Sequence, residues 1–238
     1  MKVLVTGATA GFGAAVVRRF SADGHRIVAT GRRNDRLEAL ANEFGPDRVH
    51  PVVFDVRDRN AVEAAIGGLP PDFADLDLLV NNAGLGDGGW DDMLAVNLTA
   101  AHELCVLAAD GLTQRGGAIV NVASVAALVA GPGDPQYAVS KAGLVMLTKS
   151  LAVTLGPRGG RANAICPGWV NTDMAWDGLD AFDGLTREEA FEVAMREVPL
   201  RRMSEPAEIA ATVAWLLSPD SIGVTGQAID HNNGAFMS

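Results

Sequence analysis

The stretch Val3-Leu4-Val5-Thr6-Gly7-Ala8-Thr9-Ala10-Gly11-Phe12-Gly13, close to the start of the chain, decides the fold. Its apolar beginning predicts a buried β-strand, and the segment from Phe12 to Ala22 has the period of an amphipathic helix. The glycines permit a tight turn and let the backbone approach a pyrophosphate, for which the helix N-terminus offers free N–H groups. The spacing Gly-x-x-x-Gly-x-Gly therefore predicts a nucleotide-binding strand–turn–helix unit.

The same alternation of short apolar runs and longer helical segments continues to the end of the chain. Strands are predicted at Lys2 to Thr6, Arg26 to Thr30, Val49 to Phe54, Leu76 to Val80, Ala118 to Val122, Arg161 to Ile165 and Gln227 to Asp230. Helices are predicted at Phe12 to Ala22, Arg36 to Phe44, Asn60 to Ile66, Asp91 to Ala109, Tyr137 to Leu155 and Pro206 to Leu217. This order predicts an α/β fold, with a doubly wound Rossmann-type parallel sheet of about seven strands and helices on both faces, in three α/β/α layers. No linker divides residues 1–238, so one domain is expected.

Composition excludes several classes of protein. The 238 residues are 48% hydrophobic, and 19 Lys and Arg against 29 Asp and Glu give a net charge of −10, which would repel nucleic acid and anionic lipid. No apolar run approaches the roughly 18 residues of a membrane span, and the N-terminus does not resemble a signal peptide. Two distant cysteines and four scattered histidines predict no metal site. We therefore expect a cytoplasmic protein without a nucleic-acid or membrane partner.

The residues after the second strand predict the cofactor. An NAD-selective site offers a carboxylate there to the ribose 2′-hydroxyl. This chain has Gly31-Arg32-Arg33 instead, and two guanidiniums suit a 2′-phosphate, which favours NADP. The alternative is that both arginines are solvated and NAD is used, since Asp35 lies close by. Asp55, after the third strand, is expected near the adenine.

A serine, a tyrosine and a lysine predict the chemistry. Tyr137 and Lys141 are four positions apart at the start of a helix and so share a face. A tyrosine must lose about 3 pKa units from about 10 to exchange protons near neutrality, and a cation about 4 Å away supplies about 4 kcal/mol at an effective dielectric of about 20. Ser124 follows the strand Ala118 to Val122, at the edge where open α/β sheets bind ligands, so its hydroxyl is expected to hold a carbonyl oxygen beside Tyr137.

These motifs, in this order, resemble the single-domain form of the short-chain dehydrogenase/reductase family along the whole chain. The resemblance implies a catalytic set of Asn97, Ser124, Tyr137 and Lys141. Tyr137 would exchange the hydroxyl proton, Ser124 would fix the substrate oxygen, Lys141 would bind the nicotinamide ribose and lower the Tyr137 pKa, and Asn97 would position a water of the proton relay. Asn81-Asn82-Ala83-Gly84 matches the motif that closes the fourth strand, and Pro167 to Thr172 matches the segment that holds the nicotinamide carboxamide.

The expected contacts with the cofactor are therefore numerous. They are Gly7, Thr9, Ala10, Gly11, Phe12, Gly13, Arg32, Arg33, Asp55, Val56, Asn82, Ala83, Gly84, Tyr137, Lys141, Pro167, Gly168, Val170 and Thr172. The expected activity is an NADP(H)-dependent oxidoreductase that interconverts an alcohol and a carbonyl on a small substrate. The alternatives are a non-catalytic NADP-binding regulator that senses redox state, and an NAD(H)-preferring dehydrogenase of the same family.

Four further expectations concern the substrate side and the assembly. Residues 1 to about 84 resemble NADP-dependent 3-hydroxy-acid or serine dehydrogenases, whereas the chain from Arg161 resembles 3-ketoacyl reductases and sugar-alcohol dehydrogenases. Twelve residues separate Gly84 from Asn97, so one wall of the site is shortened. Residues 169–197 are expected to form a substrate lid whose Met174, Trp176 and Phe182 line the pocket. The resemblance and the apolar outer faces of two helices predict a homo-oligomer, a tetramer.

Overall fold

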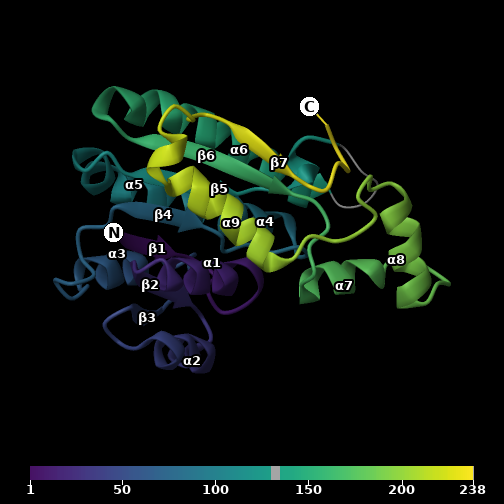
Figure 1. The fold of residues 1–238 in the computed structure, drawn as a ribbon, viewed down its shortest axis with the longest axis horizontal. Helices are drawn as coiled ribbons and strands as arrows, with labels where there is room; N and C mark the ends of the chain where they lie inside the picture. The colour runs from purple at the N-terminus through teal and green to yellow at the C-terminus, as the bar shows by residue number, and fades with distance from the viewer. Residues whose placement is uncertain (130–134, 238) are drawn as a thin grey trace.

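The computed structural model describes residues 1–129 and 135–237, and within them a parallel sheet of seven strands runs in the order β3-β2-β1-β4-β5-β6-β7 (Figure 1). The strands are β1 (Lys2–Val5), β2 (Arg26–Gly31), β3 (Val49–Val53), β4 (Leu78–Asn81), β5 (Ala118–Val122), β6 (Arg161–Pro167) and β7 (Ala228–His231). Every pairing is parallel, because each strand is followed by a crossover that returns the chain to the end of the sheet at which that strand began. The predicted fold class is confirmed.

Helices cover both faces of the sheet. They are α1 (Gly11–Ala22), α2 (Asn34–Phe44), α3 (Arg59–Gly67), α4 (Trp90–Leu94), α5 (Ala100–Gln114), α6 (Pro135–Leu155), α7 (Asp173–Leu179), α8 (Arg187–Arg196) and α9 (Pro206–Leu217), with a π-helical turn η1 (Ala95–Thr99) and 3₁₀ turns at Val125–Ala127, Gly156–Arg158 and Pro219–Ser221. Along β1, Val3 and Val5 belong to the core under α1 and α9, whereas Leu4 belongs to the core under α3 and α5. This alternation follows from the two-residue period of a strand, and it makes the sheet the middle of three layers.

The helix predicted at Asp91 to Ala109 is continuous in direction but not in hydrogen bonding. It begins as α4, passes through the π-helical turn η1 and continues as α5 to Gln114. Asn97 lies in that turn. Such single π turns are rare and are frequent at functional sites, and no periodicity in the sequence signals one.

Two helical stretches, Trp90–Gln114 and Pro135–Arg158, are long and apolar enough to cross a membrane by length and composition alone. Neither stretch contains an unbroken apolar run of about 18 residues, so neither was expected from the sequence. In the fold their inner sides pack against the sheet, in the core that contains Leu104 and Leu155. Their apolar character therefore has a structural explanation on the side that faces the strands.

The segment after β6 is helical and has a core of its own. Figure 1 shows α7 and α8 beside the sheet, beyond the ends of the strands. Leu179, Ala190 and Met195 are buried in this small core, and Trp176 and Phe182 pack against it rather than standing free. Trp176 also stacks on Phe191, with the ring centroids 5.9 Å apart. Among the three predicted pocket residues, only Met174 lies outside this cluster.

Candidate active site

The turn between β1 and α1 has the shape that a pyrophosphate requires. Gly7 has a φ of +64°, and a Cβ added there would lie 2.8 Å from the Cα of Ala83. A Cβ on Gly13 would overlap the carbonyl oxygen of Gly7. Ala10 occupies the N-cap of α1 and supplies no side-chain cap, so the first N–H groups of the helix, beginning at Gly11, remain available. A close backbone, no room for side chains and an uncapped helix N-terminus fit an anionic dinucleotide, and Phe12 continues the same first turn.

Residues at the end of β4 hold that turn in place. The Asn82 side chain donates from Nδ2 to the carbonyl oxygens of Thr6, at 2.9 Å, and of Gly7, at 3.1 Å. In return, Thr6 Oγ1 accepts hydrogen bonds of 3.0 Å from the backbone N–H groups of Asn82 and Ala83. The predicted motif at 82–84 therefore acts on the shape of the phosphate-binding turn.

Basic side chains gather where the second strand ends. Arg33 donates from Nη2 to Thr9 Oγ1 at 2.7 Å, and Arg36 donates to the Thr9 carbonyl at 3.5 Å. The side chain of Arg32 is 67% exposed, and its Nη1 lies 4.0 Å from the carboxylate of Asp55. Sequence reasoning singled out Arg32 and Arg33 but missed Arg36, which stands one helical turn beyond Arg33 and so shares its side of α2.

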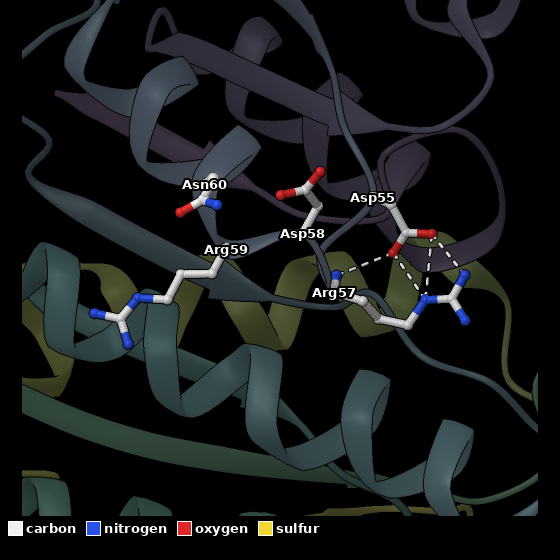
Figure 2. A pocket seen from close by; sticks show the side chains of 5 residues that line it. All are labelled: Asp55, Arg57, Asp58, Arg59 and Asn60. Atoms are coloured by element: carbon white, nitrogen blue, oxygen red, sulfur yellow. Dashed lines mark hydrogen bonds and ion pairs between the residues drawn. The ribbon is translucent and has the colours of Figure 1, made fainter.

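Asp55 is held by Arg57, a residue that the sequence analysis did not consider. Arg57 donates to the Asp55 carboxylate from its backbone N–H, Nε and Nη2, at 3.0, 3.1 and 2.8 Å, and these contacts lower the pKa of Asp55. Both residues line a cavity of about 530 Å³ with Asp58, Arg59 and Asn60. Figure 2 shows Arg57 turned onto Asp55, with Arg59 directed to the other side. Val56 lies between them in sequence and packs on the neighbouring core.

The predicted catalytic residues come together at the carboxyl edge of the sheet. Ser124 follows β5 and is buried, and its Oγ accepts from the N–H of Ala126 at 3.2 Å. Tyr137 and Lys141 lie in the first two turns of α6, and Ser124 lies close enough to the Tyr137 phenol to act on its pKa. The Nζ of Lys141 is 5.8 Å from the centre of the Tyr137 ring and donates to the Val122 carbonyl at 2.9 Å. Two hydroxyl groups and one buried cation therefore lie together at this place.

The charges at this site differ from the expectation in one respect. Burial raises the pKa of Tyr137, and the hydrogen bond with Ser124 offsets part of that rise. The ammonium of Lys141 donates its hydrogen bond to the Val122 carbonyl and lies 5.8 Å from the centre of the Tyr137 ring, so the expected lowering of the Tyr137 pKa by Lys141 stays a prediction. Burial also lowers the pKa of Lys141 from 10.5 to about 8.

Asn97 acts through its side chain on the loop after β4. Its Oδ1 accepts from the N–H of Leu85 at 2.7 Å, and its Nδ2 donates to the carbonyl of Leu85 at 3.0 Å and to Ser140 Oγ at 3.0 Å. A Cβ on Gly84 would lie 3.2 Å from Asn97 Oδ1 and 3.3 Å from Lys141 Nζ. The carboxamide is thus occupied by protein partners. The relay water expected at Asn97 stays a prediction.

The segment from Pro167 to Thr172 runs from the end of β6 to the glycine-rich turn. Pro167 ends β6, and a Cβ on Gly168 would lie 2.9 Å from the Cβ of Asn232. Val170 forms an isolated parallel bridge with Ser204. The Thr172 Cγ2 lies 3.4 Å from the Cβ position of Gly11, so this segment lies next to the glycine-rich turn. Residues predicted from four distant parts of the chain therefore lie near one another at the carboxyl edge of the sheet.

Comparisons with known proteins agree with this arrangement. A family model described as "Enoyl-(Acyl carrier protein) reductase" matches residues 7–235. Nodulation protein G of Rhizobium sp. (strain N33) is 36% identical over 99% of this chain and 97% of its own, and the 3-oxoacyl-(acyl-carrier-protein) reductase FabG of Thermotoga maritima is 33% identical over 98% and 97%. The solved actinorhodin polyketide ketoreductase with NADPH superposes with a TM-score of 0.91 at 32% identity, covering 98% of this chain and 96% of that one. A structure titled short-chain dehydrogenase/reductase from Brucella melitensis gives a TM-score of 0.91 at 29% identity over 100% and 97%. The protein is thus a member of the short-chain dehydrogenase/reductase family, an enzyme that acts on CH–OH and C=O groups.

Proposed function

We propose that this enzyme is an NADP(H)-dependent oxidoreductase that interconverts an alcohol and a carbonyl on a small substrate, with Tyr137 as the general acid and base. The observation that carries the proposal is that three groups meet where β5 ends: Ser124 lies beside the Tyr137 phenol and acts on its pKa, and the buried ammonium of Lys141 lies 5.8 Å from the centre of the tyrosine ring. Bound NADPH would supply the hydride, with its electron pair, to the carbonyl carbon in the direction of reduction. The carbonyl oxygen must gain a proton at the same time, and the phenol of Tyr137 would give it.

The side chains divide the remaining work. Ser124 holds the substrate oxygen with its hydroxyl, which lies beside the Tyr137 phenol, so both groups can act on one oxygen atom. Lys141 binds the nicotinamide ribose and stabilises the tyrosinate that forms when the proton leaves. Asn97 is a positioning residue, since it fixes Leu85 and Ser140 around the other three.

The preference for NADP over NAD rests on the basic side chains after β2. Arg32 is exposed at the end of this strand, and Arg33 and Arg36 flank Thr9 on the glycine-rich turn. A 2′-phosphate adds two negative charges that guanidinium groups bind well. The ketoreductase solved with NADPH gives a precedent for this cofactor among the relatives. An NAD(H)-preferring enzyme remains the second candidate, because the Asp55 carboxylate stands 4.0 Å from Arg32 and competes for it.

We also propose that residues 169–197 act as a lid on a single catalytic domain. Asn171 accepts a 2.8 Å hydrogen bond from Trp176 Nε1, and α7 and α8 share their small core, so the segment can move as one body. Hydrogen exchange in this segment is expected to slow when cofactor and substrate are added. Equal exchange with and without them would contradict the lid.

The setting proposed for the enzyme is the cytoplasm, as a homotetramer without nucleic-acid or membrane partners. The net charge of −10 disfavours both kinds of partner. The assembly is favoured by apolar side chains on the outer faces of α5 and α6, such as Val106 and Met146.

The test of the proposed function is the loss of reduced-nicotinamide absorbance with a panel of carbonyl compounds. Tyr137→Phe should keep affinity for NADPH and lose nearly all turnover, because it removes the proton donor and retains the ring. A protein that binds NADPH but oxidises it with no compound would be the redox-sensing regulator instead. Substantial turnover in Tyr137→Phe would refute the role of the tyrosine.

A further inference from the structure

One short segment of the chain, Thr172 to Met174, lies between the glycine-rich turn and the loop after β4. At one end, Thr172 contacts Gly11 of the glycine-rich turn. At the other end, the Sδ, Cγ and Cε atoms of Met174 lie 3.0, 3.1 and 3.3 Å from the position that a Cβ of Gly86 would occupy. The first turn of α7 therefore crosses from the β1–α1 turn to the loop after β4.

The loop against which Met174 lies, residues 85–89, is held by hydrogen bonds from Asn97 and from Gln136, the neighbour of Tyr137. Asn97 binds both backbone polar groups of Leu85. The carbonyl of Gly88 accepts a hydrogen bond of 3.2 Å from Nε2 of Gln136, the residue before Tyr137. Gly84, whose Cβ position is 3.3 Å from Lys141 Nζ, stands two residues before Gly86, which is at most about 7 Å of chain. Met174 thus lies against a loop that is held beside the predicted catalytic residues.

That loop has few side chains of its own. The loop reads Leu85-Gly86-Asp87-Gly88-Gly89, so three of its five residues lack a Cβ. Apart from Leu85, the loop itself offers no apolar side chain, and the flexible thioether side chain of Met174 adds one from another element.

We propose that Met174, lying on Gly86, sets the size limit of the substrate pocket, so that the enzyme accepts compact, uncharged carbonyl compounds. This inference rests on the proposed function and adds its substrate class. The charge follows from the neighbours of the contact, since Asp87 and Asp173 adjoin Gly86 and Met174, and within residues 1–129 and 135–237 neither has an ion-pair partner. Two carboxylates at the entrance repel an anionic substrate.

The experiment compares kcat/KM for a series of uncharged methyl ketones with alkyl chains of increasing length. Met174→Ala should raise the ratio of long-chain to short-chain kcat/KM about tenfold, because removal of the side chain admits additional methylene groups. Met174→Trp should lower the ratio, and Met174→Leu should leave it within about twofold, since its volume is similar. Met237→Ala, which truncates a methionine that is 77% exposed near the C-terminus, is the matched control.

Two outcomes separate this inference from the proposed function. If Met174→Ala changes kcat/KM by the same factor for every ketone, Met174 is only structural and the size limit is refuted, whereas turnover itself still stands. If the wild-type protein reduces no ketone, the proposed function fails. Calorimetric binding of the matching alcohols to the NADPH-loaded protein, a pair that cannot react, then measures the same chain-length ratio without turnover.

The charge of the substrate is tested with a keto acid of the same length. Its kcat/KM should be below that of the uncharged ketone, and the difference should shrink as salt is added, because salt screens the repulsion by Asp87 and Asp173. A preference for the keto acid that weakens with salt would overturn the assignment of an uncharged substrate.

Discussion

The ammonium of Lys141 donates a hydrogen bond of 2.9 Å to the carbonyl oxygen of Val122, the last residue of β5. The lysine side chain reaches this carbonyl from α6 through the core and is buried. Burial of a cation with one such partner is costly, and that cost is visible as a pKa lowered to about 8. The enzyme keeps a destabilising charge at the place where its chemistry needs one.

Replacement of this lysine should therefore stabilise the protein at neutral pH. Lys141→Met is expected to raise the free energy of unfolding by about 2 kcal/mol at pH 7 and to abolish turnover, because it removes a charged group that prefers water. Lys149→Met, on the exposed side of the same helix, is the control and should change stability little.

The sign of the pH dependence follows from the two pKa values of Lys141. Below pH 8 the lysine is charged in both the folded and the unfolded chain, and the full cost of burial is present. Between pH 8 and 10.5 the folded chain loses the proton first, so the unfolded chain binds more protons and the stability of the wild type rises relative to the variant. Denaturant unfolding across this range should show the gap between the two proteins narrowing. A constant gap would contradict the buried cation.

The pKa of Tyr137 can be measured directly, because the chain contains one tyrosine. In the free protein, the absorbance of tyrosinate should appear at a higher pH than for a tyrosine in water, because burial raises the pKa of Tyr137. Ser124→Ala should raise it further by removing the hydrogen bond that offsets burial. A pKa that falls in Ser124→Ala would show that the hydroxyl does not stabilise the phenolate.

The cofactor preference is tested at the end of β2. Arg32→Ala should weaken NADPH binding about ten- to hundredfold and NADH binding little, because NADPH alone presents a 2′-phosphate and a charged hydrogen bond contributes about 1.5 to 3 kcal/mol. Arg158→Ala, an arginine paired with Asp110 elsewhere on the surface, serves as the control. Calorimetry with both cofactors gives the comparison. Equal losses for the two would make Arg32 a structural residue.

The assembly should depend on the outer face of α6. Val153 is 78% exposed there and Met146 is 61% exposed, which is unusual for apolar side chains of this size. Light scattering at micromolar concentration should give the mass of a tetramer, and Val153→Asp should reduce it because a carboxylate would be buried between copies. Val53→Asp, on the edge strand β3, is the control. A monomeric wild type would refute the assembly.

The sequence by itself determined the alternation of elements and the parts of the site that lie along short stretches of chain. The strand–turn–helix unit around Gly7, the basic pair Arg32 and Arg33, and the pairing of Tyr137 with Lys141 can all be read from local spacing. These features are local because the periods of strands and helices and the conformation of a turn depend on neighbours in sequence. The predicted strand Ala118 to Val122 and helix Pro206 to Leu217 agree with the structure at both ends.

Only the tertiary structure decided how the distant pieces act on one another. The hold of Arg57 on Asp55, the occupation of the Asn97 carboxamide by Leu85 and the direction of the Lys141 ammonium are side-chain contacts that no spacing encodes. Trp176 was expected in the pocket and lies in the small core of α7 and α8, whereas Met174 lies against Gly86. The hydrophobicity of a side chain does not tell whether it lines a pocket or packs in a core. Which surface it covers is set by the packing of elements that are far apart in the chain, and that packing exists only once the sheet has formed.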